Sequence, residues 1–189
     1  MAAMNGTARM IRDNRIVFAT CPLQGAAMRD SIVIRPYRKS DESAIVELVR
    51  ELQGHELQLY DRMLPVDDIG PWYVQRIVRE SSDAGGGLIV AEQAGQPVGY
   101  ATLFARLDSE EAYDEVAYTY AYIGDLVVSE SARRQGVGTL LLRECETLAR
   151  QAGQRWLRIT VIASNGEAHR LYQALGFRNQ FVNLEKSLA

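Results

Sequence analysis

The sequence DLVVSESARRQGVG, at residues 125–138, decides the fold predicted for this chain. Its first part is apolar and β-branched, which is typical of a buried strand. Its second part is a basic loop containing Gly136 and Gly138, and an amphipathic helix follows directly. The first turn of a helix is electropositive and leaves its backbone N–H groups without acceptors, and glycines let a ligand come close. A strand, a glycine loop and a helix start in this order therefore predict an anion-binding site.

The spacing of the glycines narrows the class of anion. A dinucleotide-binding fingerprint needs a third glycine three residues after Gly138, but Leu141 stands there. A Walker loop needs a Gly-Lys-Ser or Gly-Lys-Thr tripeptide, which the sequence does not contain. The pattern that remains is Arg133-x-x-Gly136-x-Gly138, and a basic loop that merely caps a helix is the alternative interpretation.

Length and composition exclude several classes of protein. A chain of 189 residues suits one domain with a sizeable core, and 47% hydrophobic with 24% charged residues indicates a globular protein. A net charge of -3 argues against a general nucleic-acid binder, and no apolar run reaches the ~18 residues of a membrane span. Two cysteines and two histidines are too few for a disulfide framework or a zinc site, so we expect a cytoplasmic protein without a metal.

Hydrophobic periodicity predicts one domain over residues 31–189, preceded by an extension over residues 1–30 that is disordered or adds an edge strand. Strands are expected at residues 31–35, 88–91, 98–104, 116–128, 156–161 and 177–184. Helices are expected from an N-cap at Ser40 to Gly54, from Pro71 to the glycines at 85–87, from Gly138 to Gly153, and from a capping box at 164–167 to Gly176. This order predicts a mixed α/β fold with a partly antiparallel sheet.

Two motifs separated by a strand resemble the GNAT superfamily of acetyl-CoA-dependent N-acetyltransferases. The first is the strand, loop and helix start at residues 125–138, and the second is Asn165-x-x-Ala168-x-x-x-Tyr172-x-x-x-Gly176-Phe177. The resemblance covers about residues 31–186. It implies a GNAT fold, in which helices flank a mixed central sheet and a parallel strand pair, ending near Val128 and Val161, splays apart to hold acetyl-CoA.

The resemblance also implies which residues contact acetyl-CoA as co-substrate. Backbone groups of Val127 and Val128 would pair with the pantetheine arm, and backbone N–H groups of residues 134–139 would hold the pyrophosphate. Arg133 and Arg134 either meet the phosphates or are solvated. The full predicted set is Leu126, Val127, Val128, Arg133, Arg134, Gln135, Gly136, Val137, Gly138, Thr139, Asn165 and Tyr172. Asn165 is also suited to capping a helix, which is compatible with this role.

Tyr172 and Asp125 are the predicted catalytic residues. Tyr172 matches the family tyrosine whose hydroxyl approaches the CoA sulfur and assists the departing thiolate; membership of an apolar helix stripe is the alternative. Asp125 would hold the acceptor cation or pass its proton through water, because an aspartate with an ordinary pKa of about 3.9 is a poor base for an ammonium. A solvated carboxylate at a strand end is the alternative. The oxyanion donor would be a backbone N–H near Val127.

Tyr122, His55 and Glu56 complete the predicted acceptor site, together with Asp125. Side chains alternate along a strand, so Tyr122 shares a face with Asp125 only if a β-bulge lies between them. His55 and Glu56 are expected in a loop after the first helix, and an acidic loop at residues 108–115 is expected nearby. Solvated surface loops are the alternative for both segments.

The sequence therefore predicts an N-acetyltransferase that acts on a small cationic primary amine. A protein N-terminal or lysine acetyltransferase, and a non-catalytic acyl-CoA sensor, are the alternatives. The expected partners are acetyl-CoA and an amine acceptor, without nucleic acid or membrane, and a homodimer is common in the family.

Overall fold

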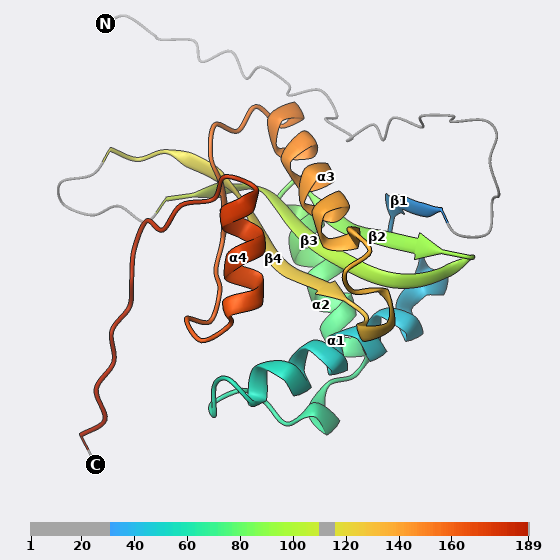
Figure 1. Cartoon of the computed structure of the whole chain (residues 1–189). Helices are drawn as coiled ribbons and strands as arrows, with labels where there is room; N and C mark the ends of the chain where they lie inside the picture. The colour runs from blue at the N-terminus through green and yellow to red at the C-terminus, as the bar shows by residue number, and fades with distance from the viewer. Residues whose placement is uncertain (1–30, 110–115, 189) are drawn as a thin grey trace, which may run out of the picture.

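The computed structural model describes residues 31–109 and 116–188 (Figure 1). The predicted extension at residues 1–30 and most of the acidic loop, residues 110–115, lie outside the described residues. The strands are β1 (Ile32–Pro36), β2 (Gly87–Gln93), β3 (Gln96–Asp108), β4 (Thr119–Val128) and β5 (Leu157–Ile159). The helices are α1 (Glu42–Leu57), α2 (Pro71–Asp83), α3 (Val137–Gln151) and α4 (Gly166–Ala174), with 3-10 turns η1 (Lys39–Asp41), η2 (Val66–Asp68) and η3 (Glu130–Ala132).

The strands form one mixed sheet in the order β1-β2-β3-β4-β5. Successive strands from β1 to β4 are antiparallel to one another, and β5 is parallel to β4. Pairing of β4 with β5 ends at Ile123 and Ile159, although β4 continues to Val128. The predicted α/β fold with a splayed parallel pair is confirmed, and the strands part earlier than expected.

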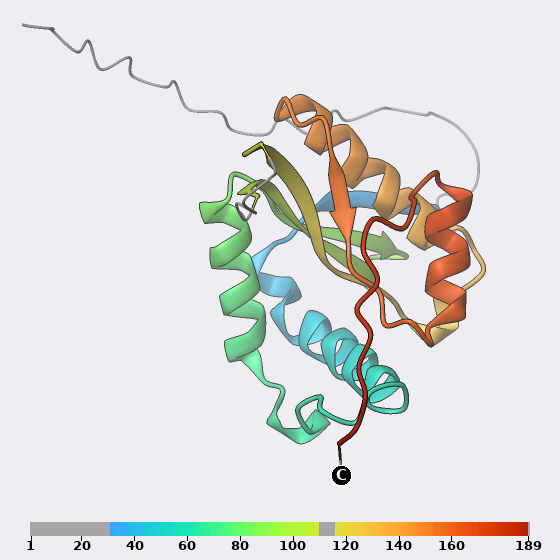
Figure 2. The same cartoon turned by 90° about the vertical axis from the view of Figure 1, so that its left-hand side faces the viewer.

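Helices cover both faces of the sheet (Figure 2). Helices α3 and α4 pack on one face, over a core that includes Ile123, Leu141 and Tyr172. Helices α1 and α2 pack on the other face, over a core that includes Ile45 and Tyr100. The sheet therefore separates two apolar cores, and β4 contributes to both of them.

Several predicted boundaries are wrong. Helix α1 continues past Gly54 to Leu57, so His55 and Glu56 are helical rather than in a loop. A glycine inside a helix costs about 1 kcal/mol, but Gly54 lies against Val66 of η2, where a Cβ atom would be 3.7 Å from the valine side chain. Ser40 lies inside η1, and Asp41 is the N-cap of α1.

The end of the chain also differs from the prediction. Asn165, and not Ser164, caps α4, and β5 spans fewer residues than the predicted strand. Residues 177–184 form no strand, because Phe177 is the last residue there whose backbone N–H bonds to a carbonyl of another described residue. Phe181 and Leu184 are consequently exposed. Within the described ranges, no helix combines the length and apolar character needed to cross a membrane.

A buried ion pair ties β1 to the start of α1. The Arg35 guanidinium donates to both carboxylate oxygens of Asp41, at 2.7 and 2.9 Å, and to Glu92 of β2 at 2.6 Å. Arg35 and Asp41 are 8% and 5% exposed. Asp41 also accepts the backbone N–H of Arg38, and its hydrogen bonds with Arg35 hold the pKa of the carboxyl below its usual range.

Asp41→Ala is expected to lower the free energy of unfolding at neutral pH by about 3 kcal/mol, because it leaves a buried guanidinium without its main partner. A carboxyl whose pKa is depressed by folding contributes stability above its unfolded pKa and loses it as the pH falls through its folded pKa. The difference from wild type should therefore shrink in acid. Urea denaturation across pH measures this. Glu47→Ala, which removes an exposed pair with Arg50, should cost less than about 0.5 kcal/mol; equal costs would contradict the assignment.

Candidate active site

The predicted anion-binding loop lies between β4 and α3. We define the phosphate loop as residues 129–136. Arg134 and Gly136 adopt left-handed conformations, with φ of 64° and 82°. Left-handed residues in a turn direct successive backbone N–H groups into one concavity. Helix α3 begins at Val137, so the amides of its first turn have no acceptor within the helix. The backbone of residues 134–139 is therefore suited to bind an anion.

Gly138 has a packing role beside this loop. A Cβ atom there would lie 3.3 Å from Leu171 of α4 and 3.7 Å from Val128 of β4. The glycine thus lets the start of α3 approach β4 and α4 closely. Val137 is 1% exposed, so only its backbone is available to a ligand.

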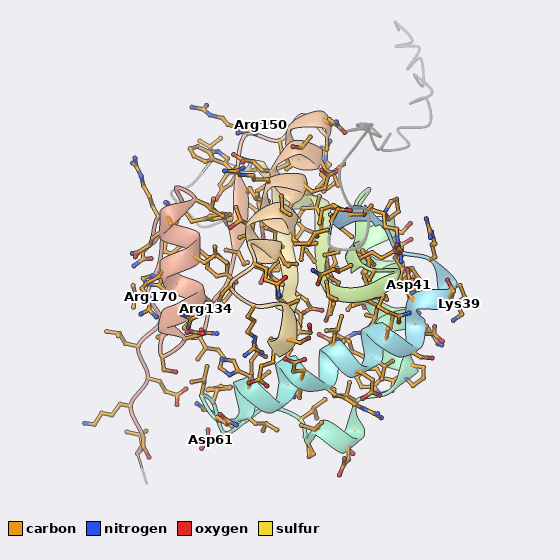
Figure 3. All side chains as sticks on the ribbon, turned by 45° about the vertical axis from the view of Figure 1, so that its right-hand side comes forward. Lys39, Asp41, Asp61, Arg134, Arg150 and Arg170 are labelled. Atoms are coloured by element: carbon orange, nitrogen blue, oxygen red, sulfur yellow. The ribbon has the colours of Figure 1, made fainter. Side chains whose placement is uncertain are left out.

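Side chains of the phosphate loop are held by neighbouring helices and by the loop itself. Arg133 bonds to Glu51 of α1 at 2.9 Å, and Arg134 bonds to Glu167 of α4 at 2.9 Å. Figure 3 shows Arg134 beside α4. The Gln135 amide donates to the carbonyl of Ser131 at 3.1 Å. The structure therefore places both predicted arginines at the loop but pairs each with a carboxylate.

The end of β4 presents a backbone edge that β5 does not cover, although the Val128 carbonyl there accepts the Arg133 Nε at 3.2 Å. The Ser129 N–H donates to the Val98 carbonyl at 2.9 Å. This bond fixes which of the preceding residues direct their backbone N–H and C=O groups toward β3. Val127 therefore turns its backbone groups toward Tyr100 of β3, whereas Leu126 and Val128 turn theirs away. Because β5 pairs with β4 only as far as Ile123, that outward edge can accept a strand-like ligand. Leu126 and Val128 are thus better placed than Val127 to bind pantetheine or an oxyanion.

A β-bulge lies directly before this edge. Ala101 pairs with Leu126 and Leu103 pairs with Ile123, so β4 carries one extra residue at Gly124-Asp125. Ile123 belongs to the core under α3 and α4, but Val127 belongs to the core under α1 and α2. The bulge reverses the alternation of side chains between the two faces of the sheet. Tyr122 and Asp125 therefore lie on the same face, as the sequence predicted for a strand with a bulge between them. The Tyr122 hydroxyl donates to Thr160 at 3.1 Å.

Two tyrosine hydroxyls hold Asp125. Tyr73 of α2 donates at 3.2 and 3.4 Å to the two carboxylate oxygens, and Tyr100 of β3 donates at 3.2 Å. Burial raises the pKa of Asp125 although part of its surface reaches solvent, and the two hydrogen bonds act in the opposite direction. Neither Tyr73 nor Tyr100 was among the residues predicted from the sequence. A buried tyrosine needs a hydrogen-bond partner for its hydroxyl, so a tyrosine in an apolar stretch predicts that a partner exists. The sequence does not indicate which residue that partner is.

Glu56 lies on the inward face of α1, four residues after Leu52 and seven after the buried Val49. Burial raises the pKa of the Glu56 carboxyl, and the nearby negative charge of Asp125 raises it further. His55 is turned about 100° around the helix from Glu56. Among the described residues, His55 makes no side-chain hydrogen bond or ion pair that brings it to Asp125.

Tyr172 of α4 faces the same region from the other side. It is 8% exposed, and its ring packs against Phe177 with centroids 5.9 Å apart. Burial raises the pKa of Tyr172 to about 12, with smaller contributions from Glu56 and Tyr122. The hydroxyl is therefore protonated at neutral pH and can serve as a donor. Asn165 accepts the Ala168 N–H at 3.1 Å, as expected of a helix cap.

Comparison with known proteins agrees with this geometry. The model of the Acetyltransferase (GNAT) family matches residues 47–177, which is more than half of the chain. The chain belongs to the GNAT acetyltransferase family. GNAT membership identifies it as an acyltransferase enzyme and implies acetyl-CoA as its co-substrate. Among the described residues, no group of three or more His, Cys, Asp or Glu side chains is arranged to hold a metal ion.

Among its GNAT relatives is thialysine N-epsilon-acetyltransferase from Mus musculus, 26% identical over 153 residues, or 76% of this chain and 82% of the relative. The Bos taurus protein of the same name is 28% identical over 152 residues, or 77% and 83% of the two chains. A mutant BH1408 protein from Bacillus halodurans superimposes with a TM-score of 0.73 at 19% identity, over 83% of this chain and 99% of that chain. The aminoglycoside acetyltransferase meta-AAC0020 from an uncultured soil metagenomic sample gives 0.58 at 19% identity, over 84% and 97%.

Asp125→Asn is expected to raise the melting temperature at neutral pH. A carboxyl whose pKa is raised by folding lowers stability once the pH exceeds its unfolded pKa, because the ionised form is better solvated in the unfolded chain. The asparagine removes that charge and keeps an acceptor for the hydroxyls of Tyr73 and Tyr100. Thermal unfolding should show a gain that shrinks toward acid. Asp108→Asn, at the exposed end of β3, serves as control; a loss of stability at Asp125 beyond the control would refute the expectation.

Proposed function

We propose that this GNAT enzyme transfers the acetyl group of acetyl-CoA to a primary amine of a small cationic molecule. The observation that carries the proposal is that the carboxylates of Asp125 and Glu56 lie near enough for their charges to interact, with Tyr172 near Glu56 and an edge of β4 that β5 does not cover. Each of the two carboxyls has a raised pKa. An ammonium group between them would relieve the repulsion of their charges, which favours a cationic acceptor.

Binding of acetyl-CoA would use the backbone more than side chains. The co-substrate supplies the acetyl group as a thioester. The amides of residues 134–139 would hold its pyrophosphate, because the left-handed Arg134 and Gly136 already turn them toward one concavity. Leu126 and Val128 would pair with the pantetheine arm and place a backbone N–H at the thioester carbonyl.

Asp125 would hold the acceptor ammonium and relay its proton through water. At pH 7, forming the free amine of a lysine-like group costs about 4.6 kcal/mol. A carboxylate with a raised pKa is a better proton acceptor than an ordinary aspartate, and Tyr73 and Tyr100 fix its orientation. Glu56 and Tyr122 would line the same pocket and hold the rest of the acceptor. His55 would contribute at its edge.

Tyr172 would donate its hydroxyl proton to the sulfur as the C–S bond breaks. Its pKa of about 12 keeps the phenol protonated at neutral pH, and its burial excludes competing water. Attack of the amine on the thioester is then direct, in a complex that holds both substrates, and the chain needs no covalent acetyl intermediate.

Two other functions would use the same fold. A protein N-terminal or lysine acetyltransferase would take a peptide amine, and an acyl-CoA sensor would bind without transfer. The mouse relative is named for thialysine and the soil protein for aminoglycosides, which supports a small amine over a peptide. The raised pKa values of Asp125 and Glu56 support catalysis over sensing.

The decisive experiment measures CoA release from acetyl-CoA with polyamines, aminoglycosides, amino acids, and peptides bearing free α-amines or lysines. We expect the highest kcat/KM with a small amine that carries a second cationic group. Preference for a peptide would favour the protein acetyltransferase. Tight binding of acetyl-CoA without transfer to any amine would favour the sensor.

Tyr172→Phe is expected to lower kcat by about tenfold or more, with near-normal binding of acetyl-CoA, because only the proton donor is lost. Steady-state kinetics and calorimetric titration with CoA measure the two quantities. Tyr60→Phe, which changes an exposed tyrosine, is the control. An unchanged kcat, in an assay limited by chemistry, would remove the assigned role.

Gly136→Glu is expected to abolish most of the affinity for acetyl-CoA, because it adds a negative charge where the pyrophosphate would bind. Gly136→Ala is the matched control. At φ 82° any side chain is strained by roughly 1–2 kcal/mol, so the alanine variant measures the strain without the charge. Equal affinities of the two variants would contradict an anion site at this loop.

A further inference from the structure

Glu51 of α1 binds the phosphate loop at two points. Its Oε1 accepts the backbone N–H of Glu130 at 2.7 Å and the Arg133 Nη2 at 2.9 Å. The Arg133 Nε in turn donates to the carbonyl of Val128, at the end of β4, at 3.2 Å. One carboxylate and one guanidinium thus join α1, the phosphate loop and the last residue of β4.

The phosphate loop needs such support because its conformation is unfavourable by itself. Arg134 is not a glycine, and its φ of 64° costs roughly 1–2 kcal/mol. Its neighbouring amides point into one concavity without acceptors, so their dipoles repel one another when no anion is bound. Two other side-chain contacts reach the loop: Gln93 to Gln135 at 3.2 Å, between neutral exposed groups, and the exposed ion pair of Arg134 with Glu167. The contacts of Glu51 are charge-assisted and therefore stronger.

The two arginines of the loop differ in how they are held. Arg133 bonds to two acceptors, Glu51 and the Val128 carbonyl, and the side chains of its pair with Glu51 are 41% and 33% exposed. Arg134 makes one ion pair, with Glu167, in which the side chains are 84% and 65% exposed. Such a pair contributes little energy and exchanges readily for a phosphate. Arg134 is thus free to change partner, whereas a new partner for Arg133 would release the loop.

We propose that Glu51 is a positioning residue that, together with Arg133, fixes the phosphate loop in its anion-binding form, and that Arg133 acts through Glu51 without touching the phosphate. The inference rests on the proposed function, since it assumes that acetyl-CoA binds at this loop. By this inference Glu51 belongs to the co-substrate site, although its side chain is negatively charged and the site binds an anion.

The sign of the effect separates this proposal from simple electrostatics. If Glu51 acted only by its charge, its removal would strengthen binding of CoA, because a nearby negative charge would be gone. If it holds the loop, its removal weakens binding. We expect Glu51→Ala to raise the Kd for CoA roughly tenfold, which corresponds to the loss of one or two charge-assisted hydrogen bonds.

The test is a double-mutant cycle on the full chain, with calorimetric titration of CoA into wild type, Glu51→Ala, Arg133→Met and the double variant. Glu47→Ala is the matched control, since it removes an ion pair on the same helix that does not reach the loop. We expect each single variant to lose affinity and the double variant to lose no more than either, because the two residues act as one unit. Unchanged or tighter binding by Glu51→Ala, or additive losses, would overturn the proposal.

Kinetics give an independent readout. Glu51→Ala should raise the KM for acetyl-CoA roughly tenfold and leave kcat within about twofold of wild type, with a melting temperature close to that of Glu47→Ala. A fall in kcat at unchanged KM, or a drop in melting temperature that accounts for the loss, would overturn the role. If wild-type protein does not bind CoA, the proposed function fails first, so the two failures are distinguishable.

Discussion

The extra residue at Gly124-Asp125 in β4 sets the geometry on which the rest of the site depends. Before it, Ile123 faces α3 and α4; after it, Val127 faces α1 and α2. Without the bulge, regular alternation would turn Asp125 into the apolar core under α3, where its charge would have no partner. The bulge instead turns Asp125 toward hydroxyls from α2 and β3, which only that face of the sheet can supply.

The same strand would also serve the co-substrate in the function proposed above. Pairing with β5 stops at Ile123, where the bulge begins, so the backbone edge beyond it has no strand partner. The chain leaves that edge through the phosphate loop and enters α3. The proposed acceptor carboxylate, pantetheine edge and anion loop therefore follow one another along residues 125–138, and contacts from distant segments hold them in place: Tyr73 and Tyr100 at Asp125, and Glu51 at the loop.

Much of this could be predicted from sequence, for reasons that are local. Strand, glycine loop and helix start are encoded within a few residues, so the fold and the anion loop were predictable. The identity of the hydroxyls on Asp125 was not, because Tyr73 and Tyr100 come from elements whose approach depends on the whole sheet. Glu56 was predicted in a loop because Gly54 suggests a helix end, whereas α1 continues through that glycine to Leu57. The retention of Arg133 by Glu51 likewise depends on a contact between distant segments.

The two carboxyls of the proposed acceptor site have a consequence for proton balance. Burial raises the pKa of both Asp125 and Glu56, so these two carboxyls ionise at a higher pH than exposed carboxyls of the same kind do. An ammonium group bound between them would favour their ionised forms, so binding of a cation would be coupled to release of protons. The heat measured when an amine binds then includes the ionisation of the buffer, and the affinity for a cation rises with pH until the amine itself begins to lose its charge.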